Sequence, residues 1–145
     1  MVAVDDSETS RCALTEAVNI AKATNARISI THVVDEVLLG MHHRVVATTL
    51  DFEKAMMAIR DAGIKILEAA RATARAAGVE AETILLETMK RRVSEVLVDK
   101  ARELGCDLIV IGRHGQRGLA LLFLGSVAEQ VARLSDISVL LVRRH

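Results

Sequence analysis

The 145-residue sequence is poor in cysteine and in long apolar runs, and each shortage excludes a class of protein. Its two cysteines, Cys12 and Cys106, are too few for a disulfide framework or a cysteine metal site. We expect them to be small buried side chains in a reducing cytosol. The longest apolar run, Leu119 to Leu124, is far too short to cross a bilayer, so we expect no membrane insertion.

An excess of charge of one sign is also missing. Lysine plus arginine and aspartate plus glutamate number 19 each, so the overall charge does not attract nucleic acid. The apolar fraction of 51% and the charged fraction of 26% are typical of a folded chain, and the length suits one domain, residues 1–145. Acidic residues at positions 5, 6 and 8 leave no signal peptide visible, which favours a cytoplasmic location.

The sequence does contain a regular alternation of strand and helix patterns. Short apolar runs predict five strands, at residues 1–4, 27–34, 79–87, 108–111 and 137–142. Apolar residues at helical spacing predict helices between them, near 8–24, 50–77, 92–104 and 126–134. This order predicts an α/β fold, a parallel sheet with helices on both faces. Residues 35–49 show neither pattern and are interpreted as a loop.

The most informative stretch follows the fourth predicted strand. Gly112 and Gly115 end that strand, and after nine further residues Gly125-Ser126 opens a helix. Glycines there let backbone N–H groups approach a ligand closely, and a helix N-terminus offers unpaired donors and the positive end of its dipole. This Gly-x2-Gly-x9-Gly-Ser spacing therefore suits phosphate. The alternative is a set of ordinary turns, in which Ser126 caps its helix together with Glu129.

This motif, and nearly the whole chain around it from Val2 to Val142, resembles the universal stress protein family in its ATP-binding type. The resemblance implies a single-domain, Rossmann-like open sheet of five parallel strands in the order 3-2-1-4-5, similar to the adenine nucleotide alpha hydrolase fold. The strand order would then reverse between strands one and four, which end at Asp5 and Gly112. Ligands bind beyond the carboxyl ends of the strands at such a reversal.

The resemblance also implies a site for ATP, with ADP or AMP left open and Mg²⁺ carried by the phosphates. Asp5 is expected at the nucleoside end, where a carboxylate accepts from ribose hydroxyls, and the backbone of Val33 at the adenine edge. Each has an ordinary alternative, a turn acid for Asp5 and a buried valine for Val33. The glycine motif and His114 are expected near the phosphates. The residues carried over are Ala3, Val4, Asp5, Val33, Ile111, Gly112, His114, Gly115, Gly125, Ser126, Val127 and Ala128.

Two positions depart from the family pattern. Relatives with good phosphate contacts often carry a hydroxyl at the position of Ala128, and many have glycine near residues 88–89, where this chain continues with the three cations of residues 90–92. These cations have two interpretations. They form a basic surface that contacts an anion or a protein partner, or they are simply solvated at the start of a helix. His42 and His43 are adjacent and have no third ligand nearby, so we expect no metal site.

The function implied by the resemblance is that of a nucleotide-dependent stress-response or regulatory protein, which acts with a regulatory protein partner. No carboxylate or histidine is clearly placed as a base for water, so no catalytic residue is assigned. A slow ATPase and an interaction module without nucleotide are the two alternatives.

The last predicted strand carries a further expectation. In the implied order it lies at the sheet edge, and five of its six residues, 137–142, are apolar, with no proline among them. Such an edge favours pairing with the same strand of a second copy, which predicts a homodimer. The alternative is that the loop at 35–49 covers this edge.

Overall fold

The computed structural model describes residues 1–35, 49–115 and 124–143. Its strands are β1 (Val2–Ala3), β2 (Ile28–Val34), β3 (Ala81–Glu87), β4 (Leu108–Gly112) and β5 (Ser138–Val142). The described helices are α1 (Glu8–Thr24), α3 (Thr49–Ala76), α4 (Val93–Glu103) and α5 (Ser126–Leu134), and none of them is long and apolar enough to cross a membrane. The loop predicted at 35–49 lies almost entirely outside the described residues.

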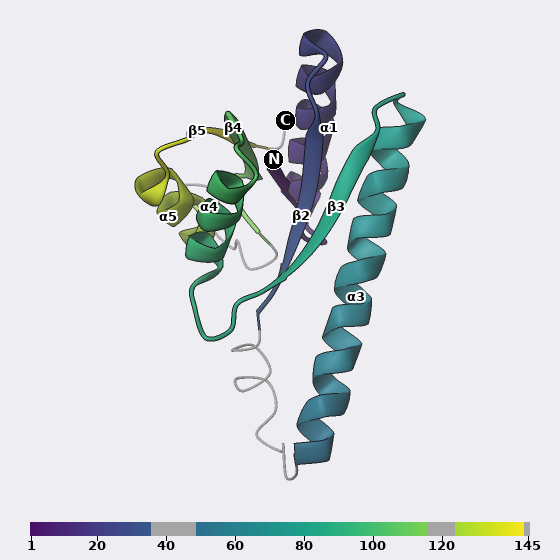
Figure 1. Ribbon diagram of the computed structural model, residues 1–145, viewed down its shortest axis with the longest axis vertical. Coiled ribbons are helices and arrows are strands. Elements are labelled where there is room, and N and C mark those ends of the chain that lie inside the picture. The colour runs from purple at the N-terminus through teal and green to yellow at the C-terminus, as the bar shows by residue number, and fades with distance from the viewer. Residues whose placement is uncertain (36–48, 116–123, 144–145) are drawn as a thin grey trace.

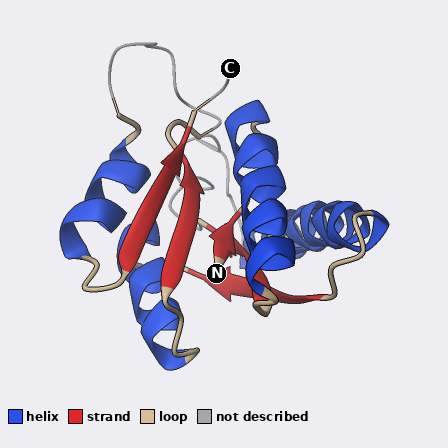
Figure 2. Ribbon diagram, turned by 90° about the horizontal axis from the view of Figure 1, so that it is seen from above, coloured by secondary structure: helices blue, strands red, loops and turns tan. Residues whose placement is uncertain are grey.

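The five strands form one parallel sheet in the order β3-β2-β1-β4-β5, which confirms the predicted topology (Figure 1). Helices α1 and α3 pack on one face of this sheet, and α4 and α5 pack on the other (Figure 2). Two layers of helices therefore enclose the strands, as right-handed crossovers between parallel strands require.

Side chains of the central strands alternate between two apolar layers. Val2 and Val110 pack with α1 and α3, whereas Ala3 packs with α4 and α5. Because both faces of β1 and β4 are covered, these strands appear in the sequence as continuous apolar runs. Cys12 and Cys106 are free thiols, one against each layer, and they are half-buried rather than fully buried as predicted.

The helix boundaries follow from local capping chemistry. Ser7 is the N-cap of α1, and its side-chain oxygen accepts from the Ser10 N–H at 3.2 Å. Asn25 ends this helix in the left-handed conformation, at φ 53°. Gly78 and Gly105, at φ 79° and 61°, follow the ends of α3 and α4, where a side chain would be strained. These ends agree with the prediction to within one or two residues.

The first strand is shorter than predicted. The sequence predicts a strand through Val4, but β1 ends at Ala3, although the Val4 N–H still donates to the Thr31 carbonyl at 2.8 Å. In a continuing parallel ladder, the Val4 carbonyl would next accept from the Val33 N–H. Within the described ranges that bond is not formed, and the Val4 carbonyl instead accepts from the imidazole Nδ1 of His32 at 2.8 Å. A side chain therefore takes the place of the next ladder bond.

The connection from β3 to α4 holds two non-glycine residues in the left-handed conformation. Met89 has φ 47° and Lys90 has φ 68°, and the Arg91 N–H donates to the Thr88 carbonyl at 2.9 Å, a combination typical of a type I′ turn. Side chains with a Cβ are disfavoured at both central positions. Thr88 is fully buried, and its hydroxyl has no hydrogen-bond partner in the described part of the chain. The backbone of this turn is therefore strained.

Replacing Lys90 with glycine is expected to stabilise the fold by about 0.5–1 kcal/mol. Relief of the left-handed strain, about 1–2 kcal/mol, exceeds the added freedom of glycine in the unfolded chain, about 0.5–1 kcal/mol. Urea denaturation measures the difference. As a control, Lys65→Gly in the exposed part of α3 should cost about 1 kcal/mol. An unchanged or lower midpoint for Lys90→Gly would contradict the strain at this turn.

Candidate functional site

A crevice of about 610 Å³ opens beyond the carboxyl ends of β1, β2 and β4. Here β1 leads to α1 on one face of the sheet and β4 leads towards α5 on the other, which is where open α/β sheets place their ligands. Every residue that the sequence assigned to a site lines this crevice, from Ala3 on β1 to Ala128 in the first turn of α5. Lining residues that the sequence did not single out include Ser10, His32 and Gly63.

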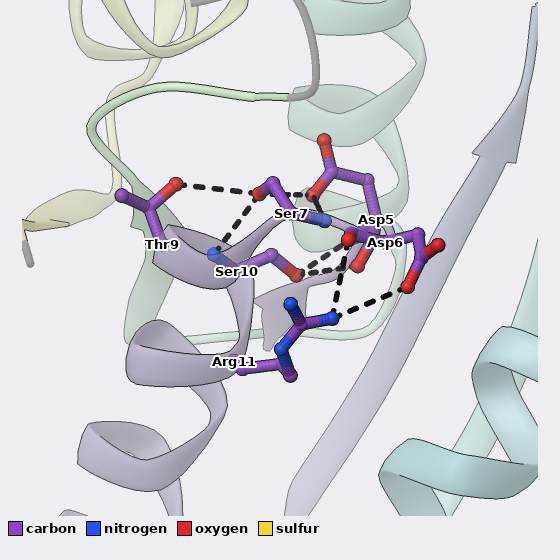
Figure 3. A network of polar contacts seen from close by, with 6 residues as sticks. All are labelled: Asp5, Asp6, Ser7, Thr9, Ser10 and Arg11. Carbon is purple, nitrogen blue, oxygen red and sulfur yellow. Dashed lines mark hydrogen bonds and ion pairs between the residues drawn. The ribbon is translucent and has the colours of Figure 1, made fainter.

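The first turn of α1 holds Asp5 in place (Figure 3). Its Oδ1 accepts from the backbone N–H of Ser7 at 3.0 Å and from the Ser7 hydroxyl at 2.5 Å. The buried Ser10 hydroxyl accepts from the Asp5 N–H at 2.8 Å and donates to the Asp5 carbonyl at 2.9 Å. The other carboxylate oxygen lies beside Gly115, where a Cβ would come within 2.9 Å of it. The position of this carboxylate is therefore set by the protein itself.

The same turn of α1 also fastens the loop that follows β4. The Thr9 hydroxyl donates to the carbonyl of His114, and it lies 3.3 Å from the Ser7 hydroxyl. Ser7 in turn donates to Asp5, so hydroxyl groups connect the end of β1 with the glycine loop. This connection escaped the sequence analysis because Thr9 and His114 are 105 positions apart.

Two glycines of the motif face protein backbone at close range. A Cβ on Gly112 would lie 3.0 Å from the backbone carbonyl carbon of Thr9, and a Cβ on Gly125 would lie 3.0 Å from the carbonyl oxygen of Arg113. That carbonyl accepts from the Gly125 N–H at 2.8 Å. Both glycines therefore permit close approach of the chain to itself, a requirement that exists with or without a ligand.

Ser126 does not cap α5, contrary to the alternative interpretation of the motif. Gly125 is the N-cap of α5, and its carbonyl accepts from the Glu129 N–H at 2.9 Å. Ser126 is the first helical residue, its side chain is exposed, and its hydroxyl makes no hydrogen bond to any described residue. The N–H groups of Ser126, Val127 and Ala128 likewise have no acceptor in the described structure, as the first turn of a helix dictates. This turn offers the crevice donors and the positive end of the helix dipole.

The backbone of Val33 faces the crevice at its other end. Along β2, the Thr31 carbonyl accepts from Val4 beside β1, and the Val34 carbonyl accepts from Thr88 on the side of β3. Backbone groups alternate in direction along a strand, so the N–H and carbonyl of Val33 point to the side of β1. Because β1 has already ended at this level, this donor and this acceptor have no partner among the described residues and face the crevice.

Comparison with known proteins agrees with this architecture. The family model described as the universal stress protein family matches residues 1–143. The universal stress protein YxiE of Bacillus subtilis is 36% identical over 146 residues, which cover 99% of this chain and 97% of that protein. The crystal structure of a universal stress protein family member from Burkholderia pseudomallei matches with a TM-score of 0.74 and 30% identity, over 97% of this chain and 92% of that one.

A crystal structure of a universal stress protein in complex with cAMP also matches, with a TM-score of 0.66 and 29% identity over 98% of this chain and 94% of that one. The fold is an open, parallel α/β sheet with a crevice at the point where the strand order reverses. The chain belongs to the universal stress protein family, as its motifs indicated.

The basic segment at residues 90–92 does not line the crevice. Arg91 pairs with Asp99 at 2.5 Å, Asp99 also pairs with Arg102 at 3.1 Å, and Arg102 pairs with Asp136 at 2.9 Å. The hydrogen bond from Arg91 lowers the pKa of Asp99, and the hydrogen bond from Arg102 lowers the pKa of Asp136. These exposed ion pairs favour the solvated helix start over a basic surface that faces the crevice.

The ion pairs predict a specific pH dependence for Asp99→Asn. Folding lowers the pKa of Asp99 below its ordinary value of 3.8, so its carboxylate contributes stability above that value and loses the contribution as the pH falls through the lower pKa of the folded state. We therefore expect Asp99→Asn to lower the urea midpoint at neutral pH but not well below pH 3.8. Asp107→Asn, which removes no ion pair of the described structure, is the control. A loss that persists in acid would mean that packing, not charge, explains the effect.

Proposed function

We propose that this chain binds ATP, or another adenine nucleotide, in the crevice and acts as a nucleotide-dependent regulator in a stress response. The observation that carries the proposal is the first turn of α5, whose N–H groups and Ser126 hydroxyl have no partners among the described residues and line the crevice. The related protein in complex with cAMP supports an adenine nucleotide as the class of ligand.

The phosphates fit the first turn of α5. Free N–H groups and the positive end of the helix dipole attract anions. The Ser126 hydroxyl adds one side-chain donor, whereas Ala128 in the same turn has no hydroxyl to add a second. Among the described residues, no group of three or more His, Cys, Asp or Glu side chains could hold a metal ion. Mg²⁺ would therefore enter the crevice already bound to the phosphates.

The nucleoside fits the opposite end, between Asp5 and Val33. A carboxylate repels phosphate but accepts hydrogen bonds from ribose hydroxyls, and Asp5 is already held in one position by Ser7 and Ser10. The open N–H and carbonyl of Val33 match the ring nitrogen and the amino group on the edge of adenine. Guanine presents a hydrogen-bearing ring nitrogen and a carbonyl on the same edge, which reverses the pattern, so this end favours adenine.

Ser126→Asp separates helix stability from phosphate binding. An acidic first-turn residue stabilises a helix by about 0.3–1 kcal/mol through the dipole, but the same carboxylate repels phosphate. We therefore expect a higher urea midpoint together with an ATP affinity that falls at least about tenfold by calorimetry.

Two further variants control this experiment. Ser126→Ala loses only the hydroxyl and should weaken ATP binding about three- to tenfold, the range of one ordinary hydrogen bond. Ala132→Asp adds the same charge at an exposed position of α5 that does not line the crevice, and should leave the affinity unchanged. Parental affinity in Ser126→Asp would rule out phosphate binding at this turn.

The homodimer is proposed to form through β5, which lies at the edge of the sheet. The Val142 carbonyl accepts from the Arg113 N–H at 2.6 Å, so the backbone groups of Val142 and Leu140 point towards β4. By the same alternation, those of Val139 and Leu141 point to the free edge. Antiparallel pairing with a second β5 would satisfy these groups and cover partly exposed apolar side chains.

This alternation selects a variant that tests the dimer without damage to the sheet. Val139→Pro removes an N–H that points outward and leaves the hydrogen bonds between β5 and β4 intact. The chain should therefore fold but remain a monomer. Val139→Thr keeps the N–H and should remain a dimer. Sedimentation equilibrium at about tens of micromolar separates the two results. A parental chain that is monomeric there, or a dimer that survives Val139→Pro, would contradict pairing through β5.

A further inference from the structure

A histidine on β2 joins the ends of two strands at the base end of the crevice. The imidazole Nδ1 of His32 lies 2.8 Å from the carbonyl oxygen of Val4. Because a carbonyl oxygen can only accept, Nδ1 carries the hydrogen and donates it. The side chain is half-buried and lines the crevice, and the residue next to it, Val33, presents its open backbone groups there.

The bond from His32 stands where a backbone bond would otherwise form. The Val4 N–H already donates to the Thr31 carbonyl, so the register of β1 and β2 offers the Val4 carbonyl to the Val33 N–H next. In the residues that the structure describes, this second bond is missing and β1 ends one residue earlier than its apolar pattern. The imidazole thus satisfies the carbonyl and leaves the Val33 N–H without a partner among the described residues.

Helix α3 provides the space that the imidazole needs. A Cβ on Gly63 would lie 2.8 Å from His32 Cδ2 and 2.8 Å from Leu85 Cδ1. Glycine in the interior of a helix is less stable than alanine, because it loses more conformational freedom on folding. Glycine at this position of the long helix therefore leaves room for the His32 ring and for the Leu85 side chain.

We infer that His32 is a positioning residue for base recognition. By occupying the Val4 carbonyl, it keeps the Val33 N–H available to a ring nitrogen of a purine that accepts a hydrogen bond, as adenine does and guanine does not. The inference rests on the proposed function and identifies the part of the site that selects the base. Without the imidazole donor, the Val33 N–H closes onto the Val4 carbonyl and is lost to the ligand.

Amide hydrogen exchange in the nucleotide-free protein tests this directly. His32→Phe keeps an aromatic ring in the space beside Gly63 but removes the donor. We expect the Val33 amide to exchange quickly in the parent and at least about tenfold more slowly in His32→Phe, because the new ladder bond protects it. The Ile30 amide, inside the paired part of β2, is the control and should exchange at the same rate in both proteins.

Two further variants distinguish the donor from the ring. His32→Asn places an amide N–H near the position of Nδ1 and should restore fast exchange at Val33. In Gly63→Ala, the added methyl group contacts His32 Cδ2 and should push the ring away from the Val4 carbonyl. Exchange of the Val33 amide should then slow although the histidine is still present. Gly63→Ala also keeps the hypothesis testable if His32→Phe does not fold.

Nucleotide affinity supplies the second measurement. ATP affinity should fall about three- to tenfold in His32→Phe, the range of one hydrogen bond, whereas GTP affinity should not change. The ratio of the ATP affinity to the GTP affinity should therefore decrease. Equal exchange of the Val33 amide in parent and His32→Phe would overturn the role of His32, even if ATP binds. If the parent binds no adenine nucleotide, the proposed function fails, and the exchange measurement still decides whether His32 keeps this amide free.

Discussion

The early end of β1 is the constraint on which the crevice depends. In a parallel sheet covered on both faces, backbone donors and acceptors are paired along the ladder, and they become available only where one strand stops before its neighbours. Here β1 stops at Ala3, while β2 continues to Val34 and β4 to Gly112. The reversal of strand order then sends the chain to opposite faces, so none of the described helices fills the gap above β1.

The glycines of the motif could be needed to admit a ligand or to let the chain approach itself, and the structure distinguishes these two reasons. The sequence suggested that glycines admit a ligand, but Gly112 is required by the first turn of α1, and Gly125 is required by the carbonyl of Arg113. The donors that would hold a phosphate belong instead to the first turn of α5. A variant with a bulky residue at Gly125 would disturb the protein before it disturbed a ligand, which is why Ser126 is the more informative position.

Most of the fold could be predicted from the sequence because it depends on short-range patterns. Apolar runs and helical spacing are local, and residues such as Asn25, Gly78 and Gly105 end helices through their own backbone conformation. The strand order and most of the residues that line the crevice came instead from the resemblance to a known family, which assigns those residues to strand ends and a helix start.

What the sequence did not reveal depends on side-chain contacts between distant segments. The bond of His32 to Val4 spans 28 positions, and the space at Gly63 is used by a ring from another element, so neither produces a periodic signal. The only sign of this role in the sequence is that His32 interrupts the apolar face of β2. The alternative interpretation of Ser126 as a cap fails for a different reason: Gly125 occupies the cap position in extended conformation and makes no side-chain bond.

The two ends of the crevice differ in how firmly the protein sets them before any ligand arrives. At the end proposed for the nucleoside, Asp5 is fixed by Ser7 and Ser10, and the Val4 carbonyl is fixed by His32. Groups held in this way lose little freedom on binding, so the proposed selectivity for a base would be strongest where they lie. At the other end, the Ser126 hydroxyl is exposed and makes no bond to described residues. With nucleotide bound as proposed, the rigid end would select adenine, and the number of phosphates would be sensed only by the first turn of α5.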